Sequence, residues 1–449
     1  MLPITSLRYY RAESKLKTTV LFLVLLVLSA CGGGGGGNKK NNPPPADNPP
    51  TFNRIALSVS PFSEIIFDAS LTMTDGQLNA NSIDSLSNFY MTYGGNEIFA
   101  RLSTERTTSA IGEDRSLAQA VNRANHANSL GLPLNPELGL FGSYGDASCQ
   151  TMPDFSEYPE ITLPGPWETL TVDQMLPALR TYGQLVAQEI VNTGVTVNIW
   201  DIGNEIGFGT AGVAPQPLVN SHCDTTEGTT DWYRAPDGVD PVIGTESVLS
   251  LLQMSEQDRI TWLQTHVWPH EARILAAVAE GIRNVVPEAK FSTHITYGQG
   301  QDFAVAFFTA MRDGGFDVDE AGFSFYPSSG TISSNSLDYF KDVVLAIRQS
   351  LNKPVFIAEY AYPAKQMTNG PYAHWNFTVP GYPLSETGQA DLLYDLVAWS
   401  KDNGVTGIRP WAPDVFVGHW EPMALFTPIN AITAQARPGL SAIGNALAE

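Results

Sequence analysis

Two glutamates, far apart in the chain, each stand at the end of an apolar segment. Glu205 follows Asn204 in "VNIWDIGNEIGFG" (197–209), and Glu359 stands in "KPVFIAEYAYP" (353–363). A single glutamate at the end of a strand is usually a solvated or salt-bridged loop residue. Two carboxyl groups that face one substrate can instead cleave a glycosidic bond, because one protonates the leaving oxygen while the other meets the oxocarbenium-like carbon. This pair therefore makes glycoside hydrolysis the first hypothesis.

Such a reaction places demands on the neighbours of the two carboxyl groups. The acid needs a raised pKa, whereas the nucleophile must stay ionised. Arg101, in the apolar segment "IFARLST" (98–104), is the candidate that holds the nucleophile in its charged form. Asn204 could donate a hydrogen bond to a sugar hydroxyl in the transition state. A separation of about 5–5.5 Å between the carboxyl groups would predict retention of the anomeric configuration.

The segments that carry these residues belong to a regular alternation. Short apolar, β-branched segments alternate with longer segments that have apolar residues at three- and four-residue spacing, which is typical of parallel strands covered by helices. The predicted helices include residues 116–131, 171–194, 270–286, 337–351 and 387–404. Eight strand segments predict an α/β protein with a single (β/α)8 (TIM) barrel: 54–60, 98–104, 138–144, 197–205, 290–296, 321–327, 354–360 and 407–412.

In a barrel of this kind the chemistry lies at the C-terminal ends of the strands. Strands four and seven face each other across the mouth, so Glu205 and Glu359 are expected to converge. Trp411 is the preferred aromatic candidate for stacking on a sugar, whereas Trp200 lies within strand four and is expected in the core. The residues expected around the mouth are Arg101, Tyr144, Asp146, Asn204, Glu205, His294, Tyr326, Glu359 and Trp411.

Composition excludes several other classes of function. Hydrophobic residues make up 43% of the 449 residues and aromatics 10%, which is typical of a globular protein. The net charge of -21 opposes binding to nucleic acid or to anionic lipid surfaces. No phosphate-binding loop, dinucleotide fingerprint, HExxH or CxxC motif is present, so nucleotide chemistry and the common zinc sites are not indicated. A polysaccharide substrate remains the expected partner.

The first 50 residues have a different character from the rest. A basic region precedes the apolar residues 20–28, which are too few to span a bilayer, and "LSAC" resembles the lipobox of bacterial lipoproteins. We expect a signal peptide (1–30), a lipidated Cys31 that starts a Gly-, Pro- and Asn-rich tether (31–50), and one catalytic domain (51–449). The chain would then be an exported lipoprotein of the outer membrane or cell surface, held to the membrane only by lipid. The alternative is an uncleaved membrane anchor. Export permits a disulfide between Cys149 and Cys223.

Several motifs, taken in order, resemble glycoside hydrolase family 53, the arabinogalactan endo-β-1,4-galactanases. They are "GNEI" (203–206), "FSFYPSSG" (323–330), "PVFIAEYAYP" (354–363) and "ALFTPINAITAQARPGLSAI" (424–443), and the likeness extends from residue 54 to residue 443. The resemblance implies a retaining endo-acting hydrolase of β-1,4-galactan, with Glu205 as acid/base and Glu359 as nucleophile. It also implies that five residues line the subsite of the cleaved sugar: Arg101, Asn204, His294, Tyr326 and Trp411.

The chain departs from the family pattern at two places. Ser143 stands where the family usually has a histidine after strand three, and the loop of residues 361–389 does not map onto the family. The exact glycan therefore stays open, with β-glucan or β-mannan as alternatives and a non-catalytic, surface-anchored glycan-binding protein as the rival from another class. No cofactor is required by the chemistry. Bacterial members can carry calcium in late loops, but no calcium-loop spacing assigns one here.

Overall fold

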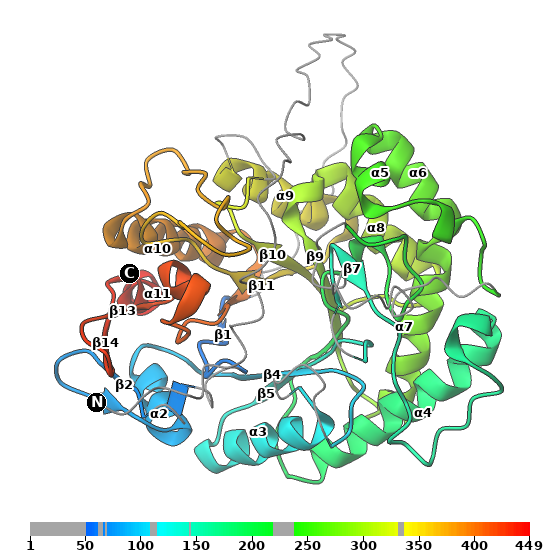
Figure 1. The fold of residues 1–449 in the computed structure, drawn as a ribbon, viewed down its shortest axis with the longest axis horizontal. Coiled ribbons are helices and arrows are strands. Elements are labelled where there is room, and N and C mark those ends of the chain that lie inside the picture. Colours follow the sequence, from blue (N-terminus) through cyan, green and yellow to red (C-terminus); the bar gives the residue numbers. More distant parts are fainter. Residues whose placement is uncertain are drawn as a thin grey trace, which may run out of the picture. The chain divides into compact units, whose positions relative to one another are not determined.

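The computed structural model describes residues 51–61, 66–67, 70–107, 115–142, 145–218, 238–330 and 336–449. These residues belong to one compact unit, in which helices surround a central set of strands (Figure 1). The predicted signal peptide, Cys31 and the tether lie outside the described residues, as do Ser143, Tyr144 and Cys223. Within the described part, no helix has both the length and the apolar character needed to cross a bilayer.

Eight parallel strands form the central sheet, and this confirms the predicted barrel. The sheet order is β1-β12-β11-β10-β9-β8-β5-β4, in which every strand lies beside its neighbour in a (β/α)8 barrel. The strands are β1 (Arg54–Ile55), β4 (Ile98–Leu102), β5 (Leu134–Leu138), β8 (Trp200–Ile202), β9 (Phe291–Thr296), β10 (Glu320–Phe325), β11 (Val355–Tyr360) and β12 (Val405–Pro410).

The barrel closes between β1 and β4 without a regular ladder. Asn96 N donates to Ile55 O at 3.0 Å, and Ile55 N donates to Asn96 Oδ1 at 2.8 Å. Further along, Phe99 N donates to the Ser58 hydroxyl oxygen at 3.1 Å. Side chains thus supply part of the hydrogen bonding that a strand pair would normally supply, and we call these contacts the β1–β4 seam.

The helices start and end where their sequences indicate. Ser116, Thr171 and Ser385 cap the N-termini of three helices by accepting backbone N–H groups. All five helices predicted from the sequence are confirmed, with boundaries that differ by up to three residues. The outer helices are α3 (Leu117–Leu130), α4 (Val172–Val191), α7 (Trp268–Arg283), α8 (Gln301–Asp313), α9 (Ser336–Leu351) and α10 (Glu386–Asp402), and the shorter ones are α2 (Ile83–Thr92), α5 (Val248–Gln253), α6 (Glu256–His266) and α11 (Gly439–Ala448).

The predicted position of strand three was wrong. The structure places this strand, β5, at Leu134–Leu138, whereas the prediction was residues 138–144. The sequence of β5 is "LNPEL", so a proline, an asparagine and a glutamate conceal a strand in which every residue is buried. Asn135 and Glu137 are buried because they pair with Arg409, which no apolar pattern can indicate. Residues 139–142 begin the segment that follows the strand.

A smaller sheet, which the sequence did not indicate, lies outside the barrel. Its order is β13-β14-β2-β3, with β13 at Phe426–Pro428, β14 at Thr433–Ala436, β2 at Thr72–Thr74 and β3 at Asn79–Ala80. Because β14 pairs in parallel with β2, the sheet joins the end of the chain to the segment that follows β1. A short hairpin of β6 (Gly145–Asp146) and β7 (Cys149–Gln150) follows β5.

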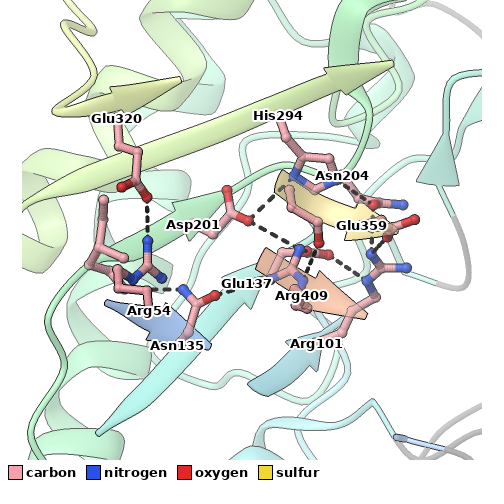
Figure 2. A network of polar contacts seen from close by, with 12 residues as sticks. Arg54, Arg101, Asn135, Glu137, Asp201, Asn204, His294, Glu320, Glu359 and Arg409 are labelled. Atoms are coloured by element: carbon pink, nitrogen blue, oxygen red, sulfur yellow. Dashed lines mark hydrogen bonds and ion pairs between the residues drawn. The ribbon is translucent and has the colours of Figure 1, made fainter. Parts of the chain in front are cut away.

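A charged cluster joins the N-terminal ends of the strands. Arg54 at the start of β1 donates to Glu97 at 2.9 Å and to Glu320 at the start of β10. Figure 2 shows Arg54 and Glu320 at one side of the polar network, away from Glu359. Charged groups at this face of a barrel serve stability rather than catalysis.

Helices α4 and α7 approach closely because glycine stands at their contact. A Cβ atom at Gly183 would lie 2.3 Å from Val278 O, and one at Gly281 would lie 2.0 Å from Arg180 O. Both distances are shorter than any real carbon–oxygen contact, so the two helix backbones could not keep their present positions.

We therefore predict that Gly281→Ala lowers the free energy of unfolding by about 1–3 kcal/mol through overpacking. Urea unfolding followed by circular dichroism measures the change. Gly444→Ala in α11 is the matched control, because its new Cβ would stay 3.5 Å from the nearest atom, Tyr93 O. The control should be neutral or gain up to about 1 kcal/mol from helix propensity. Equal stability of the two variants would contradict this packing argument.

Candidate active site

The chain turns sharply after β8, and this turn places Glu205. Gly203 has φ 92° and Glu205 has φ 51°, so two residues within three adopt left-handed backbone conformations. A Cβ atom at Gly203 would lie 2.7 Å from Ile206 Cγ2, so glycine is required there. A non-glycine residue in this conformation costs on the order of 1–3 kcal/mol, and such strain is concentrated at functional sites. The buried strand therefore ends in a carboxylate because the backbone leaves the strand at this point.

Glu359 lies near the end of β11, where it is only 5% exposed. One carboxylate oxygen accepts a hydrogen bond from Arg101 Nη2, and the other accepts one from the Tyr326 hydroxyl at 2.5 Å. Burial alone would raise the pKa of Glu359, but the positive charges of Arg101, His294 and Arg409 outweigh it and hold the pKa below its ordinary value. Glu359 is therefore kept ionised.

Glu205 has the opposite electrostatic environment. Burial, followed by the negative charges of Glu359 and Asp146, raises the pKa of Glu205 to about 7. Its carboxylate accepts a long hydrogen bond from Ala147 N at 3.3 Å. Two carboxyl groups whose environments push their pKa values apart can act as a proton donor and an ionised nucleophile at the same pH.

Arg101 joins the residues around Glu359. Its guanidinium donates to Glu137 on β5, to Asn204 Oδ1 at 2.7 Å and to Glu359 on β11 (Figure 2). It also lies 4.2 Å from the centroid of the Trp411 ring, so this ring packs against a buried cation. Arg101 is 4% exposed. A single side chain thus sets both the charge of Glu359 and the position of Asn204.

Asn204 and His294 continue the network. Asn204 Oδ1 accepts from His294 Nε2 at 2.9 Å, and Asn204 Nδ2 donates to Gly145 O at 2.6 Å. On the other side of the imidazole ring, His294 Nδ1 lies 3.3 Å from Asp201 Oδ2. Burial lowers the pKa of His294, but the negative charge of Asp201 and its hydrogen bond raise it above the ordinary value overall. The ring therefore donates from Nε2 to Asn204 and places its positive charge beside the Asp201 carboxylate.

Three charged residues beneath the site were not predicted. Arg409 on β12 donates to Glu137 Oε2 at 2.6 Å, and its Nη2 lies 3.5 Å from Asp201 Oδ2. All three are almost fully buried. Such residues are rarely buried unless they are paired. The sequence feature that could have indicated Asp201 and Arg409 is a charged residue within an otherwise apolar strand segment, as in "IWDIG" and "GIRPWA".

One group of side chains has the spacing of a metal site. Among the described residues, ligand atoms of Glu137, His294 and Glu359 lie within 4.8 Å of one another. Both carboxylates accept hydrogen bonds from Arg101, so a guanidinium already supplies the positive charge between them. The group does not fit a metal ion, and no calcium site is assigned.

The structure brings together most of the side chains expected at the mouth. Tyr144 lies outside the described residues. Asp146 is partly used in a local turn, where its carboxylate accepts from Ser148 N at 2.7 Å and from Cys149 N at 3.2 Å. Cys149 is disulfide-bonded, and its pairing with Cys223 stays a prediction. Trp200 is fully buried, as expected of a core residue. The residues joined by contacts are Arg101, Asn204, His294, Tyr326, Glu359 and Trp411.

The electrostatic coupling of the two glutamates can be measured directly. We predict that Glu359→Gln lowers the pKa of Glu205 from about 7, because it removes the strongest like charge near that carboxyl group. Carbon-13 NMR titration of labelled glutamate, with Glu205→Gln to identify the resonance, reports the value. Asp146→Asn is the matched control and should lower the pKa less, since Asp146 acts more weakly. An unchanged Glu205 pKa in the Glu359→Gln variant would contradict the coupling.

Comparison with known proteins agrees with this geometry. A stretch of 176 residues, 38% of the chain, is 25% identical to the arabinogalactan endo-β-1,4-galactanase of Cellvibrio japonicus, and it spans 45% of that relative's length. A fungal β-1,4-galactanase structure matches with a TM-score of 0.60 and 19% identity over 88% of this chain and 99% of its own. The family 53 catalytic domain of Ignisphaera aggregans matches with a TM-score of 0.62 and 17% identity, over 90% of this chain and 98% of that domain.

The two structural matches establish the fold alone, because sequence identities of 17–19% are too low to show a shared function. The family is established separately, by a match of residues 154–427 to the model of glycosyl hydrolase family 53. That segment covers more than half of the chain and includes both glutamates. The chain therefore belongs to glycosyl hydrolase family 53.

Proposed function

We propose that this protein is a retaining, endo-acting glycoside hydrolase that cleaves β-1,4-galactan of the arabinogalactan type. The observation that carries the proposal is the pair Glu205 and Glu359, whose pKa values are shifted in opposite directions at the C-terminal ends of β8 and β11. Family membership supports the reaction type. The similarity to a protein named arabinogalactan endo-β-1,4-galactanase supports the substrate.

In the proposed first step, the ionised Glu359 attacks the anomeric carbon while Glu205 donates its proton to the leaving glycosidic oxygen. The bond from the anomeric carbon to that oxygen breaks, and a covalent sugar–Glu359 ester forms. In the second step Glu205, now ionised, takes a proton from water as the water oxygen attacks the anomeric carbon. The ester breaks, and both carboxyl groups return to their starting states.

The neighbours of the pair take supporting roles in this proposal. Arg101 and the Tyr326 hydroxyl hold Glu359 ionised and in position through two hydrogen bonds. Asn204 uses one amide hydrogen on Gly145 O, so its second amide hydrogen is the one that can reach a sugar hydroxyl. Trp411, partly exposed beside Arg101, offers an aromatic surface to the cleaved sugar.

We also propose that the protein is an exported lipoprotein anchored through Cys31. The support is the basic and apolar start of the chain, the "LSAC" motif and the Gly-, Pro- and Asn-rich segment that follows it. A tether of this composition would let the catalytic domain reach a polymer outside the cell.

The pH dependence follows from the two shifted pKa values. We predict that kcat/KM falls as the pH drops below the pKa of Glu359, which is lower than that of an ordinary glutamate, because the nucleophile becomes protonated. It also falls as the pH rises through about 7, because Glu205 loses its proton. Glu205→Gln should remove the alkaline limb and reduce kcat/KM on galactan by about 10²–10⁴-fold. Glu280→Gln on the exposed face of α7 is the control and should keep the parent profile. An alkaline limb that survives in Glu205→Gln would contradict the assignment.

Substrate and nucleophile are tested together on a panel of β-1,4-galactan, β-glucan and β-mannan. We expect early release of galacto-oligosaccharides of mixed length with the β configuration at the new reducing end, as NMR would show. Glu359→Gln should lose this turnover and still bind galactan. Cleavage of glucan or mannan without cleavage of galactan would overturn the assignment of galactan as the substrate. Binding without turnover by the parent protein would instead favour the non-catalytic glycan-binding alternative.

A further inference from the structure

Four aromatic side chains from three different loops gather next to Glu359. Tyr326 follows β10, Tyr372 and Trp375 lie between β11 and α10, and Trp420 lies in the 3₁₀ helix η7 (Gly418–Met423) after β12. The ring centroids are 5.3 Å apart for Tyr326 and Trp375, 4.9 Å for Tyr372 and Trp375, and 5.2 Å for Tyr372 and Trp420. All four side chains are partly exposed. We call Tyr372, Trp375 and Trp420 the aromatic wall.

The aromatic wall lies one side chain away from the proposed nucleophile. The Tyr326 ring contacts Trp375 and, at 6.2 Å between centroids, Trp420, while its hydroxyl donates to Glu359 at 2.5 Å. If one sugar of the polysaccharide lay over Glu359, the next sugar of the polysaccharide would therefore be within reach of the aromatic wall.

The rings of the wall do not stack on one another. Interplanar angles are 64° for Tyr372 and Trp375, 77° for Tyr372 and Trp420, and 68° for Trp375 and Trp420. Aromatic surface that remains partly exposed beside a catalytic carboxylate is the kind that lines ligand sites.

The loop that carries the wall is fixed by its own hydrogen bonds. Asn376 Oδ1 accepts from Met367 N at 2.7 Å, and Asn376 Nδ2 donates to Met367 O at 2.9 Å and to Ala373 O at 2.8 Å. Phe377 N donates to Ser328 O at 3.2 Å, which ties the loop to the residues after β10.

A second tie joins the other end of the loop to η7. Ala364 N donates to Pro422 O at 2.8 Å, and Lys365 Nζ lies 2.6 Å from Glu421. The aromatic side chains are therefore already in place before a ligand arrives, which lowers the entropic cost of binding.

We propose that Tyr372, Trp375 and Trp420 form a subsite that binds a galactosyl unit adjacent to the one that is cleaved. The inference rests on the proposed function and names a part of its specificity. The wall comes largely from residues 361–389, the segment that did not map onto the family pattern.

Binding to a variant that cannot turn over the substrate tests the subsite. In a Glu359→Gln background, we expect Trp375→Ala to weaken the affinity for galactotetraose by about tenfold, measured by isothermal titration calorimetry. Trp375→Phe should recover most of the affinity, because the ring is kept. Tyr394→Ala, which removes a partly exposed aromatic on α10 outside the wall, is the matched control and should leave the affinity unchanged. Thermal unfolding confirms that each variant is folded.

The outcomes separate this proposal from the proposed function. If Trp375→Ala binds galactotetraose as tightly as its background, the wall only supports Tyr326 and the subsite is overturned. If the background protein does not bind galactotetraose, the subsite is also overturned. If the parent protein fails to cleave galactan while the ring-dependent loss of binding is seen, the subsite stands and the proposed hydrolysis falls.

Discussion

A buried arginine holds the active site together. Arg101 lies between the carboxylates of Glu137 and Glu359 and also contacts Asn204, so three strands of the barrel meet at one guanidinium. An isolated carboxylate in this interior would be protonated, because desolvation disfavours its charge. The planar guanidinium can bind several acceptors at once and stays charged at every relevant pH. The ionised state of Glu359 therefore depends on Arg101 more than on any other side chain.

A network of this kind is not an efficient way to stabilise a fold. Removing charges from water costs several kcal/mol per ion, and the pairing energy often does no more than offset it. Asp201, Arg409 and Glu137 nevertheless lie beneath the site, where apolar side chains would fill the barrel at lower cost. Their arrangement is best understood as support for the chemistry. Arg409 adds to the positive charge that lowers the pKa of Glu359, while burial and then the charge of Glu359 raise the pKa of Glu205.

The sequence was sufficient to predict the barrel and to place Glu205 and Glu359 near the ends of two of its strands, because both predictions depend on local patterns. Most of the predicted strand segments are rich in apolar residues, Glu359 directly follows the run "VFIA", and Glu205 comes three residues after Ile202. The third strand was misplaced because "LNPEL" carries polar residues that are paired only in three dimensions. For the same reason Glu137, Asp201 and Arg409 were missed. The aromatic wall combines two loops that lie some 45 residues apart in the chain, and only the fold brings them together.

The β1–β4 seam has a consequence for how the molecule responds to heat. At this junction between neighbouring barrel strands, asparagine and serine side chains take the place of a continuous ladder in the described residues. The strand on one side of it, β4, carries Arg101. A barrel that loosens first along this edge withdraws the counter-ion of Glu359 while most of the helical shell is still intact. Warming would then separate Glu359 from Arg101 before it melts the protein, and a few polar contacts remote from both carboxyl groups would set the temperature limit of the proposed catalysis.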